Sequence, residues 1–101
     1  MVSRLSRSDA LKLLRACLQN GIVEYHQHFA WRCRERGIDP MDAQYVLRKG
    51  VIFDEPELDS RFREWRYTVE GKPPDGGKLR VVITFLERDE VLVITVMLDK
   101  R

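Results

Sequence analysis

One histidine and two arginines stand at helical spacing in the segment 28–36. His28, Arg32 and Arg36 follow one another four residues apart, so on a helix they form a row along one side. An imidazole titrates near neutral pH, and guanidinium groups hold phosphate oxygens through paired hydrogen bonds. The row therefore combines a candidate general base with two candidate phosphate ligands. These are catalytic groups that can cleave a phosphodiester without a metal.

The second half of the chain adds candidate side chains on predicted strands. Residues two apart on a strand share a face, which places Arg66 and Thr68 together, away from the aromatic Tyr67. The same alternation brings Arg80, Thr84 and Thr95 to that face, the one not covered by helices. The candidate catalytic residues are His28, Arg32, Arg36, Arg66 and Thr95, and the candidate substrate-binding residues are Tyr67, Arg80 and Thr84.

Each candidate also has a purely structural interpretation. His28 near a helix start can bond to backbone, and the arginines of the same helix can form salt bridges with neighbouring carboxylates. Thr95 suits a strand, and Tyr67 suits a core. Arg66 is the hardest to explain structurally, although Glu64 on the same side of the strand can neutralise it.

Local signals predict three helices followed mainly by strands. Ser8 is the expected cap of the first helix, Gly37 ends the second, and Asp39-Pro40 starts the third. The expected helices span residues 8–20, 27–36 and 40–49, and the expected strands span residues 22–25, 51–53, 61–70, 79–87 and 90–98. The predicted fold class is α+β, with N-terminal helices packed on one face of an antiparallel sheet.

The last two predicted strands form a hairpin with its turn at Arg88-Asp89. A regular register from that turn places Val82 opposite Thr95 and Thr84 opposite Val93. Val91 and Val93 then lie on the open face with the threonines. A shift of one residue would invert this assignment, since it moves every side chain to the other face.

Composition sets the class of protein. The 101 residues predict one domain, 1–101, and 44% hydrophobic with 34% charged residues is ordinary for a soluble globular protein. No apolar run is long enough to span a membrane and no secretory signal is visible, so a cytoplasmic protein without membrane contact is expected. Cys17 and Cys33 are expected to be buried thiols, and neither belongs to a zinc-type pair. No metal or other cofactor is expected.

The order of these landmarks resembles a known family. His28-x3-Arg32-x3-Arg36-Gly37-Ile38, a glycine-rich loop at 71–77 and a closing Ile94-Thr95-Val96 resemble a bacterial family of uncharacterised small domains. That family, a domain of unknown function, is grouped with RelE- and BrnT-type toxins. The resemblance covers residues 22–98 and leaves 1–21 as an extra N-terminal helix. It implies a RelE-like fold, metal-independent endoribonuclease activity on mRNA or tRNA, and a cognate antitoxin as partner.

Two other functions fit the same residues. The first is a non-catalytic module that holds a protein on its sheet face or edge. The second is a homodimer without enzymatic activity. The net charge of only +2 favours a protein partner, because domains that bind nucleic acid strongly are usually more basic.

Overall fold

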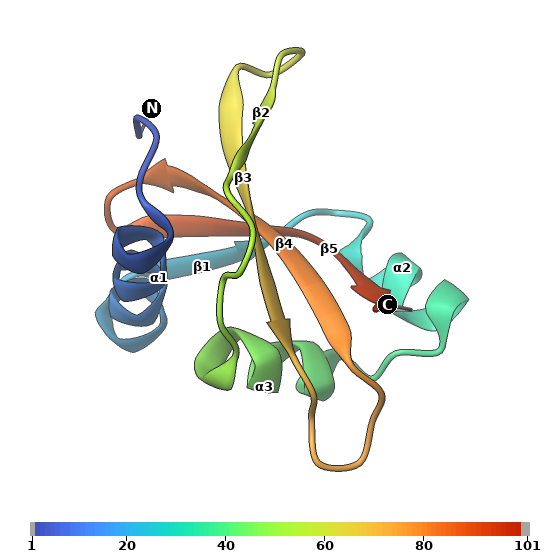
Figure 1. Cartoon of the computed structure of the whole chain (residues 1–101). Helices are drawn as coiled ribbons and strands as arrows, with labels where there is room; N and C mark the ends of the chain where they lie inside the picture. The colour runs from blue at the N-terminus through green and yellow to red at the C-terminus, as the bar shows by residue number, and fades with distance from the viewer. Residues whose placement is uncertain (1, 100–101) are drawn as a thin grey trace.

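The computed structural model describes residues 2–99 as an α+β fold with three helices and a five-stranded sheet (Figure 1). The helices are α1 (Arg7–Asn20), α2 (Phe29–Arg36) and α3 (Pro40–Lys49), and the strands are β1 (Ile22–Tyr25), β2 (Glu57–Asp59), β3 (Glu64–Gly71), β4 (Leu79–Glu87) and β5 (Glu90–Leu98). The predicted fold class is confirmed. No helix within residues 2–99 is both long and apolar enough to cross a membrane.

The strands lie in the order β1-β5-β4-β3-β2, and the sheet is mixed. The pairs β2–β3, β3–β4 and β4–β5 are antiparallel. The pair β1–β5 is parallel, with Ile22 opposite Glu90. The prediction of a wholly antiparallel sheet is therefore wrong at one edge. A short turn between two strands makes them antiparallel, so the sequence predicts the direction of hairpin strands. β1 and β5 are far apart in the sequence, and no local pattern predicts their relative direction.

The helix boundaries follow from local chemistry. The Asp39 side chain accepts a backbone hydrogen bond at the start of α3, and Gly37 after α2 has a left-handed φ of 66°, both as predicted. The cap of α1 is Ser6, whose hydroxyl accepts from the backbone N–H of Asp9 at 3.1 Å. The predicted cap, Ser8, lies inside the helix, so α1 begins slightly earlier than expected.

The predicted strand at 51–53 is reduced to a single bridge. Val51 pairs with Glu70, and the preceding Gly50 lies so close to β3 that a Cβ atom would be 2.5 Å from the Glu70 carbonyl oxygen. The predicted strand 61–70 begins only at residue 64, because a tight turn precedes it. In that turn the Asp59 carboxylate accepts the N–H groups of Arg61 and Phe62. The turn creates β2, which the sequence did not predict, and the β2–β3 hairpin projects beyond the body of the domain (Figure 1).

The β4–β5 hairpin is irregular where the prediction assumed a regular one. Val82 lies opposite Thr95 as predicted, but the next pair towards the turn is Ile83 opposite Val93, so β5 has one extra residue there. Such a bulge reverses which residues face the core. Val93 and Val91 are consequently fully buried, and their predicted place on the open face is wrong.

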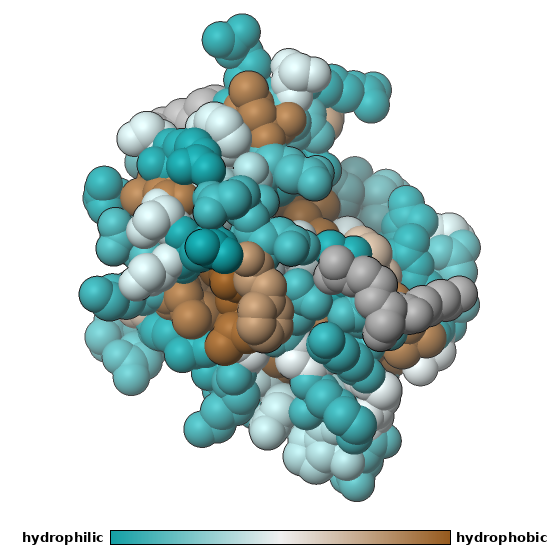
Figure 2. Space-filling view, in the orientation of Figure 1, coloured by the Kyte–Doolittle hydropathy of each residue, from teal (hydrophilic) through white to brown (hydrophobic). Residues whose placement is uncertain are grey.

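The apolar core lies mainly between the sheet and the helices. α1 and α3 pack against the sheet, and α2 lies along the second half of β5, beyond the end of β1. Cys17 and Cys33 are free, buried thiols as predicted, and burial raises the pKa of both. The face shown in Figure 2 carries hydrophobic side chains only in patches separated by hydrophilic ones.

Candidate functional site

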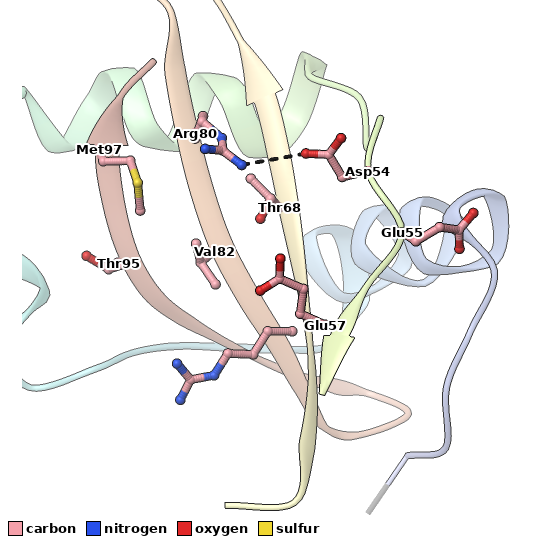
Figure 3. A pocket seen from close by; sticks show the side chains of 9 residues that line it. Asp54, Glu55, Glu57, Thr68, Arg80, Val82, Thr95 and Met97 are labelled. Carbon is pink, nitrogen blue, oxygen red and sulfur yellow. Dashed lines mark ion pairs between the residues drawn. The ribbon is translucent and has the colours of Figure 1, made fainter. Parts of the chain in front are cut away.

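The sheet face turned away from α3 carries a hollow of about 400 Å³ (Figure 3). Its lining consists of Asp54, Glu55, Glu57, Arg66, Thr68, Arg80, Val82, Thr95 and Met97. We call this the sheet hollow. Strand alternation builds it, since each of β3, β4 and β5 contributes two side chains two residues apart. Arg66, Thr68, Arg80 and Thr95 thus lie together, as the alternation predicted, while their function stays a prediction.

Arg66 is fixed between two carboxylates. Its Nη2 lies 3.1 Å from Asp59 Oδ2, and its Nε lies 3.1 Å from Glu64 Oε2. The backbone N–H of Phe62 and the charge of Arg66 lower the pKa of Asp59. The guanidinium is therefore held by β2 and β3 together, and it is oriented before any ligand arrives.

Arg80 is held more loosely. Its Nη2 lies 3.6 Å from Asp54 Oδ2, the ion pair drawn as a dashed line in Figure 3. Its Nε is buried and has no hydrogen-bond partner within residues 2–99. A buried donor without an acceptor is costly, so this contact leaves the Arg80 side chain incompletely satisfied.

Arg36 reaches the rim of the hollow from α2. Its Nη1 donates to Thr95 Oγ1 at 3.2 Å and to the Val96 carbonyl oxygen at 2.8 Å. β1 covers the edge of β5 only as far as Val93, so the Val96 carbonyl lies on an edge where no further strand among residues 2–99 pairs. Arg36 therefore completes the edge of the sheet and holds a hydroxyl of the hollow in place.

His28 and Arg32 lie away from the hollow. His28 is exposed at the start of α2, where its backbone N–H donates to His26 Nδ1 at 3.2 Å. Arg32 lies 3.6 Å from Glu35 and also contacts the Trp31 ring. Eight helical residues span about 12 Å, and only the Arg36 end of this row reaches the hollow. Of the predicted catalytic residues, Arg66 and Thr95 line the hollow, whereas His28 does not face it.

Two of the predicted substrate-binding residues are buried in the scaffold. Tyr67 is 1% exposed, and its hydroxyl accepts the backbone N–H of Leu5 at 2.9 Å. Thr84 is 2% exposed and donates to the Trp65 carbonyl oxygen at 2.8 Å. Neither side chain lines the hollow, because the packing of β3 and β4 uses both. Arg80 is the member of this predicted set that faces the hollow.

The sequence interpretation missed the acidic part of the hollow. Asp54, Glu55 and Glu57 line it, and Glu57 is exposed and lies opposite Arg66 in the β2–β3 pairing. The signal was present as the acidic segment 54–57, but it was interpreted as a turn or sheet edge. Three carboxylates and two guanidiniums give the lining a formal charge of −1. The hollow thus offers guanidinium donors together with carboxylates that can accept a proton.

Comparison with known proteins identifies the family. A family model described as "Domain of unknown function (DUF4258)" matches residues 25–98, and its description carries no link to RelE or BrnT toxins. No curated protein and no solved structure matches the chain. The family match includes every residue that lines the sheet hollow and excludes α1. Because it covers well over half of the sequence, the chain belongs to the DUF4258 family of domains of unknown function.

Proposed function

We propose that the domain is a metal-independent endoribonuclease that binds the scissile phosphate of RNA in the sheet hollow. One observation carries the proposal: a single open hollow combines two guanidiniums, two threonine hydroxyls and three exposed carboxylates, among them Glu57. These are the groups that such cleavage needs, namely cations for the charge on phosphate, donors for its oxygens, and a base.

The proposed step is attack by the ribose 2′-oxygen. Glu57 accepts the 2′-hydroxyl proton, the 2′-oxygen bonds to phosphorus, and the bond from phosphorus to the 5′-oxygen breaks. The departing 5′-oxygen takes a proton from solvent, which leaves a 2′,3′-cyclic phosphate and a 5′-hydroxyl. Arg66 and Arg80 stabilise the negative charge that builds on the phosphate oxygens.

The loose contact of Arg80 supports phosphate binding. Asp54 is half-exposed and lies 3.6 Å away, and such surface ion pairs contribute only about 0–1 kcal/mol. A phosphate that accepts two charge-assisted hydrogen bonds from one guanidinium is a stronger partner.

The test is cleavage of an end-labelled RNA oligonucleotide by purified protein in the presence of EDTA. We expect cyclic-phosphate products, and a rate about 10²–10⁴-fold lower for Glu57→Gln. Lys72→Gln, on an exposed loop, is the matched control and should cleave at the wild-type rate. Intact RNA after long incubation, or an undiminished rate for Glu57→Gln, would contradict the proposal.

A non-catalytic binding module is the second candidate. The observation in its favour is that both guanidiniums of the hollow already have carboxylate partners, which leaves the lining with no excess positive charge. RNA affinity that falls steeply between about 50 and 200 mM salt supports phosphate contacts. Salt-insensitive binding of a protein, without RNA cleavage, supports the module.

A further inference from the structure

Two adjoining depressions run along α1, with volumes of about 650 and 430 Å³. They share Ser8 and Leu11, so they form one surface, which we call the α1 groove. One end lies against the segment 51–55 and the other reaches Gln19. α1 has 14 residues and is about 21 Å long, which sets the length of partner segment that the groove accommodates.

The α1 groove concentrates positive charge. Its charged lining consists of Arg4, Arg7, Lys12, Arg15 and Glu55. Four cations and one carboxylate give a formal excess of three positive charges, more than the +2 of the whole chain. Glu55 already pairs with Arg4 at 2.8 Å and with Arg7 at 3.2 Å. The remaining cations therefore have no carboxylate within the groove.

Lys12 and Arg15 lie in the half of the groove that Glu55 does not line. Lys12 is exposed and forms no ion pair with any of residues 2–99. Arg15 donates to the Gly50 carbonyl oxygen, while its Nε is buried without a hydrogen-bond partner in the part of the chain described. This half of the groove is thus complementary to carboxylates supplied from outside.

The floor of the groove is aliphatic. Leu11, Ala16, Val51 and Ile52 line it, and no aromatic ring lies among the lining residues. Single-stranded nucleic acids are bound largely by stacking bases on aromatic rings, which this floor does not offer. A membrane surface takes up large apolar side chains that protrude, whereas Leu11 is only partly exposed and Ile52 is buried. An aliphatic floor with a cationic rim instead fits an amphipathic peptide.

We propose that the α1 groove docks an acidic amphipathic helix of a partner protein. The apolar side of that helix packs on Leu11 and Ala16, and its carboxylates pair with Lys12 and Arg15. α1 lies outside the family match at 25–98, while Val51, Ile52 and Glu55 at one end of the groove lie within it. The inference is independent of the ribonuclease proposal, since the groove and the sheet hollow share only Glu55.

The probe is a fluorescent 15-residue synthetic helix with leucines along one side and glutamates elsewhere, titrated with the full chain. Two matched peptides replace all glutamates by lysine or all leucines by alanine. We expect the acidic leucine peptide to bind at least about tenfold more tightly than either, because only it offers both carboxylates and apolar area. Amide resonances of α1 and of residues 51–55 should shift on binding.

Charge reversal at the groove provides the matched protein variants. Lys12→Glu should weaken the acidic peptide about fivefold or more, since it replaces an ion pair by repulsion. Lys72→Glu makes the same change on a distant exposed loop and should alter affinity less than twofold. Equal effects of the two variants, equal binding of the three peptides, or displacement of the peptide by an RNA oligonucleotide would overturn the proposal. RNA cleavage by Lys12→Glu at the wild-type rate keeps this test separate from the proposed function.

Discussion

The sheet hollow and the α1 groove are neighbouring surfaces that differ in how far their charged side chains are paired within the chain. In the hollow, Arg66 and Arg80 both lie beside carboxylates of the same chain, and the lining is formally −1. In the groove, cations exceed carboxylates by three, and Lys12 has no ion pair within residues 2–99. The cations of the hollow are thus paired with carboxylates of the same chain, whereas the groove has an excess of positive charge that an external anion can neutralise.

The difference indicates two kinds of task. A guanidinium held between carboxylates loses little freedom when a ligand arrives, which suits a site that must position reacting atoms. A rim with excess positive charge attracts and orients an acidic partner without holding any one atom in a fixed position, which suits a docking surface. The hollow lies entirely within the family match, and most of the groove comes from α1 outside it. The family domain thus carries the candidate chemistry, and the added helix carries the candidate docking surface.

The largest expected effect is that of Arg66→Ala, which should impair the sheet hollow and leave the α1 groove unchanged. Arg66→Ala should slow RNA cleavage about 10²–10³-fold, or roughly 2.7–4 kcal/mol, because it removes a phosphate ligand and leaves Asp59 and Glu64 to repel the substrate. Binding of the acidic peptide should change less than twofold. Single-turnover cleavage and peptide titration measure the two effects. A parallel loss of both activities would show that the surfaces are not separate.

The next effect tests whether Arg36 belongs to the scaffold. Arg36→Ala removes the donor to Thr95 and to the Val96 carbonyl, and it should lower the free energy of unfolding by about 1–3 kcal/mol. Arg34→Ala on the same helix is exposed and should change it by less than about 0.5 kcal/mol. Urea unfolding measures both. If the two variants are equally stable, Arg36 does not support the sheet edge.

The parts of the site that the sequence predicted depend on local periodicity. Arg66 and Thr68 share a face because strand side chains alternate, and this alternation is independent of the partner strand. Glycine and proline signals are equally local, which is why Gly37 and Asp39 stand where predicted. About half of the candidate site, and the fold class, could be obtained in this way.

The remainder depends on tertiary pairing that no short pattern records. The bulge in β5 turns Val91 and Val93 into the core, although a regular hairpin would expose them. Helical spacing predicted one row from His28 to Arg36, but it did not indicate that α2 starts at Phe29 and that Arg36 alone of the row bonds to β5. The acidic lining was missed because Glu57 joins the hollow through β2, a strand of three residues.

A smaller effect is expected from the hydrogen bond between Tyr67 on β3 and the backbone of Leu5, beside the α1 groove. Tyr67→Phe removes the hydroxyl that accepts the Leu5 N–H, which should cost about 0.5–1.5 kcal/mol of unfolding free energy. Leu5 adjoins Arg4 at the end of the α1 groove, so the amide of residue 5 should exchange faster with solvent. Hydrogen exchange and urea unfolding measure these changes. An unchanged exchange rate would indicate that Tyr67 does not anchor the N-terminal segment.

The smallest effect is a pH dependence with opposite signs at two carboxyls. The Phe62 N–H, together with the charge of Arg66, lowers the pKa of Asp59 below its ordinary 3.8. Its contribution to stability is therefore present above that value and lost as the pH falls through the lower folded-state value. Asp59→Asn should be less stable than wild type at neutral pH, and the difference should shrink on acidification.

Glu90, at the start of β5, behaves in the reverse way. A hydrogen bond with Glu24, then partial burial and the charges of Glu24, Asp89 and Glu87, raise its pKa above the ordinary 4.5. Its contribution is therefore full below that value and lost as the pH rises through the higher folded-state value. Glu90→Gln should be more stable than wild type at neutral pH, with the advantage disappearing in acid. Urea midpoints between about pH 3 and pH 7 measure both variants. Parallel curves would mean that the Phe62 N–H and Arg66 do not favour the charged form of Asp59, and that neighbouring carboxylates do not disfavour the charged form of Glu90.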